Sequence, residues 1–229
     1  MNELIHNYIV IEGNIGAGKT YLSNLIALEN NRDLILEEFE GNKNEYLSNF
    51  YEYQEKNPSE AEKYILGMEM SFLILRTEQL KLYFNTKRDR GVVADYDLGK
   101  CLIFPDVNLV GINKNLHNRY FNLLKDSLPK PNLIVYLERT ITNLQELIKG
   151  RNRPKEQDIP NKYLENIHEG YLKYFNSLSD QPILKLDVTG MNIPNKREHY
   201  KKVFSLINKN YPPGITHFTT KEILALNVD

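Results

Sequence analysis

The clearest chemistry lies between residues 8 and 22, where YIVIEGNIGAGKTYL joins an apolar run, a glycine-rich turn and a segment of helical spacing. Within it, Gly13-x-x-x-x-Gly18-Lys19-Thr20 matches a phosphate-binding loop. Small residues allow the backbone N–H groups and the positive end of the next helix to face a phosphate. Lys19 would reach the terminal phosphates and Thr20 would bind magnesium. The predicted nucleotide-binding residues are Gly13, Asn14, Ile15, Gly16, Ala17, Gly18, Lys19 and Thr20.

Carboxylates end two further apolar runs. The run DLILEEF at residues 33–39 contains Glu37 and Glu38, and GVVAD at residues 91–95 ends in Asp95. Ligands of open parallel sheets bind beyond the carboxyl ends of the strands, so Glu37 or Glu38 would emerge on the same rim as the phosphate loop. A solvated strand end is the alternative for both. Asp95 has the form of the acidic residue that holds magnesium in phosphate-loop sites, directly or through water.

Two charges interrupt the apolar helical pattern between residues 60 and 85. Glu69 and Arg76 are two helical turns apart, so they share one face of the helix. Buried charges are rarely left unpaired. The two residues are therefore either a solvated edge of the helix or the polar part of a pocket.

A basic loop, KGRNRPKEQ, occupies residues 149–157. Charged loops are usually only solvated. In a phosphate-loop protein, however, arginines from a loop can neutralise the charge that develops on a transferred phosphoryl group. We favour this second interpretation for Arg151 and Arg153.

These side chains need a sheet whose strands end at one edge. Apolar runs predict strands at 9–11, 33–39, 91–95, 132–137 and 183–187, and helical spacing predicts helices at 60–85, 98–104, 113–128, 141–148 and 196–210. Strands that alternate with helices form a parallel sheet covered on both faces. The prediction is a three-layer α/β fold with a five-stranded parallel sheet, in one domain that spans residues 1–229.

Three details of this fold are also predicted. Pro105 should stop the helix at 98–104, because proline breaks the helical hydrogen-bond pattern. In the helix at 113–128, Leu116, Tyr120, Leu123 and Leu124 should face inward. The tail at 211–229 carries no clear signal.

Composition limits the classes of function. Lysine plus arginine number 29 and aspartate plus glutamate number 30, so no basic field favours a nucleic acid polymer as partner. The single cysteine, Cys101, allows no internal disulfide, and no apolar run is long enough for a membrane span. We therefore expect a cytoplasmic protein that acts on a small molecule, with magnesium as its only metal.

Five strings in this order resemble the deoxynucleoside kinase family, over about residues 7–187. They are IVIEGNIGAGKT, LEEF, YILGMEMSFLILR, VVADYDLGKCLIF and GRNRPKEQDIPNKYLE. The first string and the pattern EQ-x-IP-x-x-YLE are the most specific. The resemblance implies a nucleoside-kinase-like phosphate-loop fold with a lid at about 149–158 that carries arginines, and a homodimer formed through the helices at 60–85 and 113–128.

The resemblance also implies roles. Glu37 would be the base that orients and deprotonates the nucleoside 5′-hydroxyl, Arg151 and Arg153 the lid arginines, and Glu156 the carboxylate that binds the sugar 3′-hydroxyl. Glu69 stands where the family usually has a base-reading glutamine, and Arg76 where it has the partner arginine. Tyr51, or else Tyr53, would contact the sugar.

Two positions depart from the family pattern. The sequence Asp95-Tyr96-Asp97 stands where an acidic residue, an arginine and a serine are typical, so the arginine near the 5′-hydroxyl is missing. Asn152 stands where the lid usually has glycine. The first departure puts catalytic efficiency in doubt.

The expected activity is transfer of the γ-phosphoryl group of ATP, with Mg²⁺, to the 5′-hydroxyl of a deoxyribonucleoside, preferably a purine one. One alternative is a nucleoside monophosphate kinase of the thymidylate kinase type, for which Arg76 is the only evident phosphate-binding candidate in the substrate half. Another is a regulatory nucleotide-binding protein without catalysis, for which Tyr96 is the only hint. The sequence lacks the Asn-Lys-x-Asp motif of GTP-binding switches.

Overall fold

The structure is a computed structural model that describes residues 4–37, 46, 49, 52–53, 57–86, 89–153 and 156–228. The chain divides into two compact units. Unit 1 comprises Met1–Leu36, Arg88–Asp97 and Pro131–Asp229, and unit 2 comprises Glu37–Lys87 and Leu98–Lys130.

Unit 1 is built on a parallel sheet, in which the described residues form six strands in the order β2-β3-β1-β4-β5-β6. The strands are β1 (Tyr8–Gly13), β2 (Asp33–Ile35), β3 (Val92–Ala94), β4 (Leu133–Glu138), β5 (Pro182–Asp187) and β6 (Gly214–Phe218). All six residues of β1 are buried, as its apolar run predicts. The chain enters β3 on one side of β1 and β4 on the other, which is the switch point where parallel sheets bind ligands.

The α/β fold with a parallel sheet is confirmed, but the predicted number of five strands is wrong. The sixth strand, β6, pairs with β5 at the edge of the sheet. Its residues GITHF are half-buried and exposed in alternation, so they lack the apolar run that marks the other strands. The short helix α9 (Thr220–Leu224) follows, with a capping box formed by Thr219 and Glu222.

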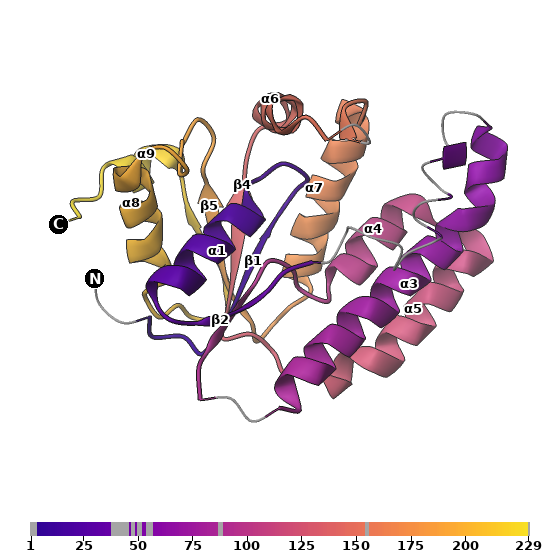
Figure 1. Cartoon of the computed structure of the whole chain (residues 1–229), viewed down its shortest axis with the longest axis horizontal. Coiled ribbons are helices and arrows are strands. Elements are labelled where there is room, and N and C mark those ends of the chain that lie inside the picture. Colours follow the sequence, from indigo (N-terminus) through magenta and orange to yellow (C-terminus); the bar gives the residue numbers. More distant parts are fainter. Residues whose placement is uncertain are drawn as a thin grey trace. The chain divides into compact units, whose positions relative to one another are not determined.

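Helices cover both faces of the sheet in unit 1, namely α1 (Lys19–Glu29), α6 (Ile141–Arg151), α7 (Asn161–Asn176) and α8 (Arg197–Ile207) (Figure 1). One face, which includes Ile9 and Ile11, packs in a core with Ile26 of α1 and Val203 of α8. On the other face Tyr136 of β4 packs against Tyr171 of α7, with ring centroids 5.0 Å apart. The sheet is thereby closed to solvent on both sides of the central strand.

Among its described residues, unit 2 contains the helices α3 (Pro58–Phe84), α4 (Lys100–Asn108) and α5 (Gly111–Leu124) and the short 3-10 helix η1 (Lys125–Ser127). Leu73, Leu98, Cys101 and Phe121 form its apolar core. The prediction that Pro105 stops the helix at 98–104 is wrong, because the corresponding helix α4 continues to Asn108. Proline removes one N–H donor in this short helix, and Leu109 N still donates to Pro105 O at 2.9 Å.

The inward face predicted for the helix at 113–128 is wrong for three of its four residues, whereas Leu124 packs against the apolar core of unit 2 as predicted. Leu116, Tyr120 and Leu123 are 40%, 46% and 77% exposed, whereas His117 and Phe121 are buried. Both sets recur at helical spacing, so α5 has apolar side chains on two faces and periodicity does not select between them. The consequence is a stripe of exposed apolar side chains along α5.

Candidate active site

The phosphate loop connects β1 to α1, as predicted. Gly16 and Gly18 have φ angles of 81° and 98°, which glycine adopts without steric cost. A Cβ on Gly16 would lie 2.8 Å from Ile148 Cγ1 of α6. The close packing of α6 against the loop therefore also favours glycine at this position. The ammonium of Lys19 donates to Gly13 O at 2.8 Å and to Asn14 O at 3.0 Å, and thus spans the mouth of the loop.

Two side chains hold the loop in this shape. Asn14 donates from Nδ2 to Leu164 O at 2.8 Å, and its Oδ1 accepts from Ile15 N at 2.8 Å. Arg139 donates from Nε to Ala17 O at 3.1 Å and from Nη1 to Val188 O at 2.7 Å. Burial lowers the pKa of Arg139. Arg139 is not among the residues predicted from the sequence, although it directly follows the buried strand β4.

The two predicted magnesium ligands lie together. Thr20 donates from Oγ1 to Asp95 Oδ2 at 2.5 Å, and Asp95 is 2% exposed. Hydroxyl and carboxylate oxygens are the donors that Mg²⁺ takes, usually one or two from protein with phosphate and water completing the shell. Within the described residues no group of three His, Cys, Asp or Glu side chains could hold a metal. Thr20 and Asp95 therefore fit a magnesium ion that is bound mainly through a nucleotide.

The segment after β3 is fixed to the base of the loop. Glu12 is 1% exposed and accepts from Asp97 N at 2.6 Å and from Tyr171 Oη at 2.7 Å. Tyr174 donates to Asp97 Oδ2 at 2.7 Å. Tyr96 is fully buried, at 0% exposure, so it serves as a core residue where the family pattern has an arginine.

The lid residues predicted from the basic loop are brought together in unit 1. Arg151, the last residue of α6, donates to Glu156 Oε2, and Arg153 Nη1 lies 3.4 Å from Glu156 Oε1. The arginine side chains are 38% and 43% exposed. Asn152 has φ 52° at the end of α6, a left-handed conformation that asparagine tolerates better than most residues. This explains how asparagine can stand where glycine is usual.

Glu37, the predicted catalytic base, lies in unit 2 and is held by two cations. Glu37 accepts at Oε1 from Arg76, through Nε at 2.8 Å and through Nη2, and at Oε2 from Lys100 Nζ at 2.5 Å. Burial acts to raise the pKa of Glu37, but the charges of Arg76 and Lys100 outweigh it and lower the pKa to about 2. Glu37 is therefore ionised at neutral pH. Glu38 lies outside the described residues.

Glu69 and Arg76 are 2% and 6% exposed, so the face of α3 that they share is not a solvated edge. Glu69 Oε1 accepts from Asn108 Nδ2 at 2.6 Å, a contact that sequence patterns do not reveal. Burial raises the pKa of Glu69 to about 7, although Asn108 and the charge of Arg76 act in the opposite direction. A carboxyl group that titrates near neutral pH can both donate and accept hydrogen bonds.

Of the two candidate sugar-contacting tyrosines, Tyr53 is among the described residues. Tyr51 lies outside the described residues. Tyr53 stacks on Tyr64 of α3, with ring centroids 5.5 Å apart and an interplanar angle of 5°. The stack gives Tyr53 a packing role in unit 2.

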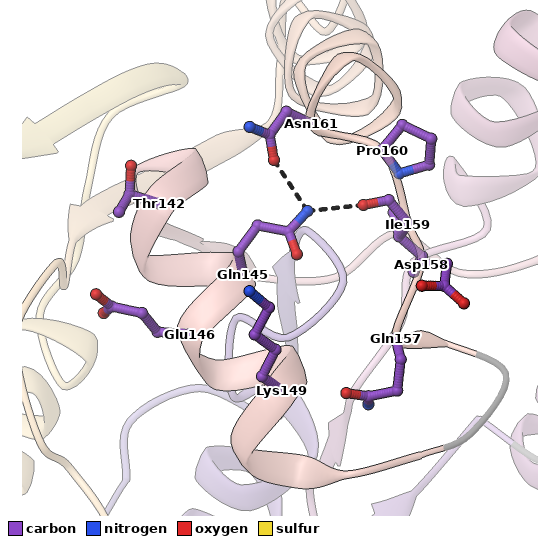
Figure 2. A pocket seen from close by; sticks show the side chains of 9 residues that line it. All are labelled: Thr142, Gln145, Glu146, Lys149, Gln157, Asp158, Ile159, Pro160 and Asn161. Carbon is purple, nitrogen blue, oxygen red and sulfur yellow. Dashed lines mark hydrogen bonds between the residues drawn. The ribbon is translucent and has the colours of Figure 1, made fainter.

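A hollow of about 610 Å³ lies in unit 1 between α6 and the 157–161 segment. Figure 2 shows that Gln145 crosses it, donating to Ile159 O at 2.7 Å and to Asn161 Oδ1 at 3.0 Å. None of the predicted site residues lines it. The hollow is therefore not the predicted nucleotide site.

The predicted residues thus form two groups. The phosphate loop, Asp95 and the lid arginines belong to unit 1, and Glu37, Glu69 and Arg76 belong to unit 2. Within the described residues, no helix is both long enough and apolar enough to cross a bilayer.

Comparison with known proteins gives a consistent family. The family model described as deoxynucleoside kinase matches residues 9–211. Deoxyguanosine kinase of Bacillus subtilis (strain 168) is 34% identical over 166 residues, covering 72% of this chain and 76% of that protein. Deoxyadenosine kinase of Dictyostelium discoideum is 27% identical over 184 residues, covering 79% of this chain and 71% of that protein.

Among solved structures, deoxyadenosine kinase from M. mycoides with bound dATP matches with a TM-score of 0.72 and 22% identity. The match covers 88% of this chain and 100% of that chain. The extent of the family match and the identity to the Bacillus enzyme lead to one conclusion. This chain belongs to the deoxynucleoside kinase family.

Proposed function

We propose that this deoxynucleoside kinase transfers the γ-phosphoryl group of ATP, bound with Mg²⁺, to the 5′-hydroxyl of a purine deoxyribonucleoside. The observation that carries the proposal is Glu37, an ionised carboxylate with a side chain 2% exposed, in a chain that also has a phosphate loop. A simple nucleotide hydrolase would not need a buried carboxylate in a second unit. Phosphoryl transfer depends mainly on positioning and charge stabilisation, which these groups can supply.

The proposed roles follow from the chemistry of each group. The loop residues 13–20 bind the phosphates of ATP, with Lys19 on the terminal phosphates and Thr20 and Asp95 on Mg²⁺. Arg151 and Arg153 stabilise the charge of the transferred group, and Glu156 binds the sugar 3′-hydroxyl. For these lid residues to act on a substrate, their mutual hydrogen bonds must exchange for bonds to it.

Base recognition is assigned to Glu69, supported by Asn108 and Arg76. An ionised carboxylate accepts only, which suits the two donors of the guanine edge. A protonated carboxyl donates and accepts, which suits adenine. A pKa of about 7 gives both forms near neutral pH. The names of the relatives, deoxyguanosine kinase and deoxyadenosine kinase, agree with a purine substrate.

We further propose that both units serve a single kinase domain, which acts as a cytoplasmic homodimer. Support for the dimer comes from α3 and α5, which carry exposed apolar side chains including Leu82 and Leu123. Exposed apolar stripes on monomers commonly mark interaction surfaces. Cys101 is a buried free thiol, in keeping with a reducing compartment.

The test is a coupled assay of ADP release from ATP over the four deoxyribonucleosides and the matching monophosphates, with and without Mg²⁺. We expect turnover with deoxyguanosine and deoxyadenosine, none with monophosphates, and loss of turnover when the metal is removed. Turnover with monophosphates only would assign the chain to the monophosphate kinases. Nucleotide binding without turnover on any substrate would assign it a regulatory role.

A further inference from the structure

Glu37 is held by two buried cations from different helices of unit 2. Arg76, on α3, donates two hydrogen bonds to Oε1 and one to Cys101 Sγ at 3.1 Å, and Lys100, the first residue of α4, donates to Oε2 at 2.5 Å. The side chains of Glu37, Arg76 and Lys100 are 2%, 7% and 4% exposed. Each carboxylate oxygen is therefore oriented by a different cation.

The second cation needs an explanation. Removing an ammonium group from water is energetically unfavourable, even after the surrounding protein relaxes. Arg76 and Lys100 together place two positive charges beside the single charge of Glu37. A cation–π contact offsets only a small part of this desolvation, since Lys100 Nζ lies 5.7 Å from the centroid of the Phe104 ring. The position of Lys100 at Oε2 points instead to a role in what Glu37 does.

We propose that Lys100 is the positioning residue of the reaction: it fixes Glu37 Oε2 as the atom that receives the 5′-hydroxyl proton, and places a positive charge beside it. The inference rests on the proposed function, in which Glu37 binds that hydroxyl. The inference also addresses the departure at position 96, where the buried Tyr96 stands in place of the arginine of the family pattern. Lys100, four positions later in the chain, supplies a cation to the carboxylate from a different site.

The chemistry balances without any further reactant. The 5′-oxygen forms a bond to the γ-phosphorus of ATP, the bond from that phosphorus to the β–γ bridging oxygen breaks, and ADP leaves. The hydroxyl proton passes to Glu37 Oε2, while Lys100 keeps its protons. A carboxylate between two cations is a weak base, but in a loose transition state the hydroxyl needs orientation more than early deprotonation.

The test replaces Lys100 by methionine, which keeps the length of the side chain and removes its charge. We expect kcat to fall about a hundredfold or more, with KM for ATP and for the nucleoside within about threefold of the wild type. The loss of one cation raises the pKa of Glu37, so the acid limb of the kcat profile should move up by about one pH unit or more. Lys100→Arg keeps the charge and should keep the wild-type limb.

The titratable neighbours of Glu37 in unit 2, which include Arg76, Cys101 and Glu69, are unchanged in these variants, so they do not shift the limb by themselves. Lys114→Met, in which a half-buried lysine paired with Asp106 is lost from the same unit, is the matched control and should leave kcat unchanged. If Lys100→Met does not fold, Lys100→Gln keeps a donor for Glu37 and the same readings decide. A folded variant with wild-type kcat and acid limb overturns the inference. An inactive wild-type enzyme would instead overturn the proposed function.

Discussion

Asn108 of α4 donates its side-chain amide to Glu69 Oε1 of α3 across 2.6 Å, in a part of unit 2 where Glu69 is 2% exposed. Loss of the Asn108 amide would leave Oε1 as a buried acceptor without this donor, which would lower the free energy of unfolding by about 1 to 3 kcal/mol. The bond also fixes the orientation of the carboxyl group. Glu69 is thus a pre-oriented group, and its protonation state is the main variable left for the base recognition that we propose for it.

Base preference should therefore depend on pH. Below about pH 7 Glu69 is mainly protonated and matches adenine, and above it the ionised form matches guanine. We expect the ratio of kcat/KM for deoxyguanosine to that for deoxyadenosine to rise about tenfold or more between roughly pH 6 and pH 8. Glu69→Gln, which has no charge to lose, should make the ratio independent of pH. A wild-type ratio that stays constant would mean that Glu69 does not read the base.

The same residue predicts a pH dependence of folding stability. Burial raises the pKa of Glu69 from 4.5 to about 7, so between these values the folded chain binds more protons than the unfolded chain. The contribution of Glu69 to the free energy of unfolding is therefore largest below pH 4.5 and falls as pH rises through 7. The full change is roughly 3 kcal/mol.

Thermal unfolding of the wild type and Glu69→Gln measures this effect. The melting temperature of the variant relative to the wild type should be higher at about pH 8 than at about pH 5. Glu165→Gln, at an exposed carboxylate of α7, serves as the control and should show no such trend. Parallel curves for Glu69→Gln and the wild type would contradict the burial of an ionisable group at this position.

Glu37 and Lys19 should fail in different ways when replaced. Glu37→Gln keeps the shape of the side chain but removes the charge that we propose accepts the hydroxyl proton, so kcat should fall by about 10² to 10⁴ while nucleoside affinity stays near that of the wild type. Lys19→Ala removes the ammonium that spans the loop, so ATP affinity and kcat should fall together. Calorimetric titration and steady-state kinetics separate the two. Normal turnover in Glu37→Gln would transfer the role to Glu38.

Sequence reasoning was most successful where a function is contained in a continuous segment. The phosphate loop follows from one motif, because its glycines, lysine and threonine act through local backbone geometry. Asp95 could be added because parallel strands end at one edge of the sheet. Thr20 and Asp95, far apart in the chain, are indeed 2.5 Å apart.

It failed where packing between helices selects a partner. Lys100 and Asn108 carry no motif, and their contacts with Glu37 and Glu69 depend on how α4 packs against α3. The open choice for Glu69 and Arg76 had the same origin, since periodicity gives a shared face but not its burial. β6 was missed because an edge strand buries too little apolar surface to leave a pattern.

The lid arginines should affect turnover and not stability. Arg151→Ala or Arg153→Ala should lower kcat by about 10³, as loss of arginine stabilisation does in other phosphoryl transfers. Their pairs with Glu156 are more than a third exposed on the arginine side, so the melting temperature should change by only a few degrees. Lys162→Ala, which removes one exposed charge from α7 outside the lid, is the matched control and should leave kcat and the melting temperature unchanged. A large loss of stability with activity per folded molecule retained would make the lid contacts structural.

The exposed stripe on α5 should hold two copies of the chain together. Leu116, Tyr120 and Leu123 lie on one face of the helix, and Leu123 is 77% exposed. Burial of such side chains in an interface contributes about 1.5 to 3 kcal/mol each, whereas a buried unpaired carboxylate opposes association.

Leu123→Glu should therefore shift the protein from a dimer toward the monomer mass of 26.8 kDa, measured by light scattering across a concentration series. Leu28→Glu places the same charge at a leucine of α1 that is 82% exposed, in unit 1, and should leave the mass unchanged. A wild type that stays monomeric at all concentrations, or a Leu123→Glu protein that stays dimeric, would remove α5 from the interface.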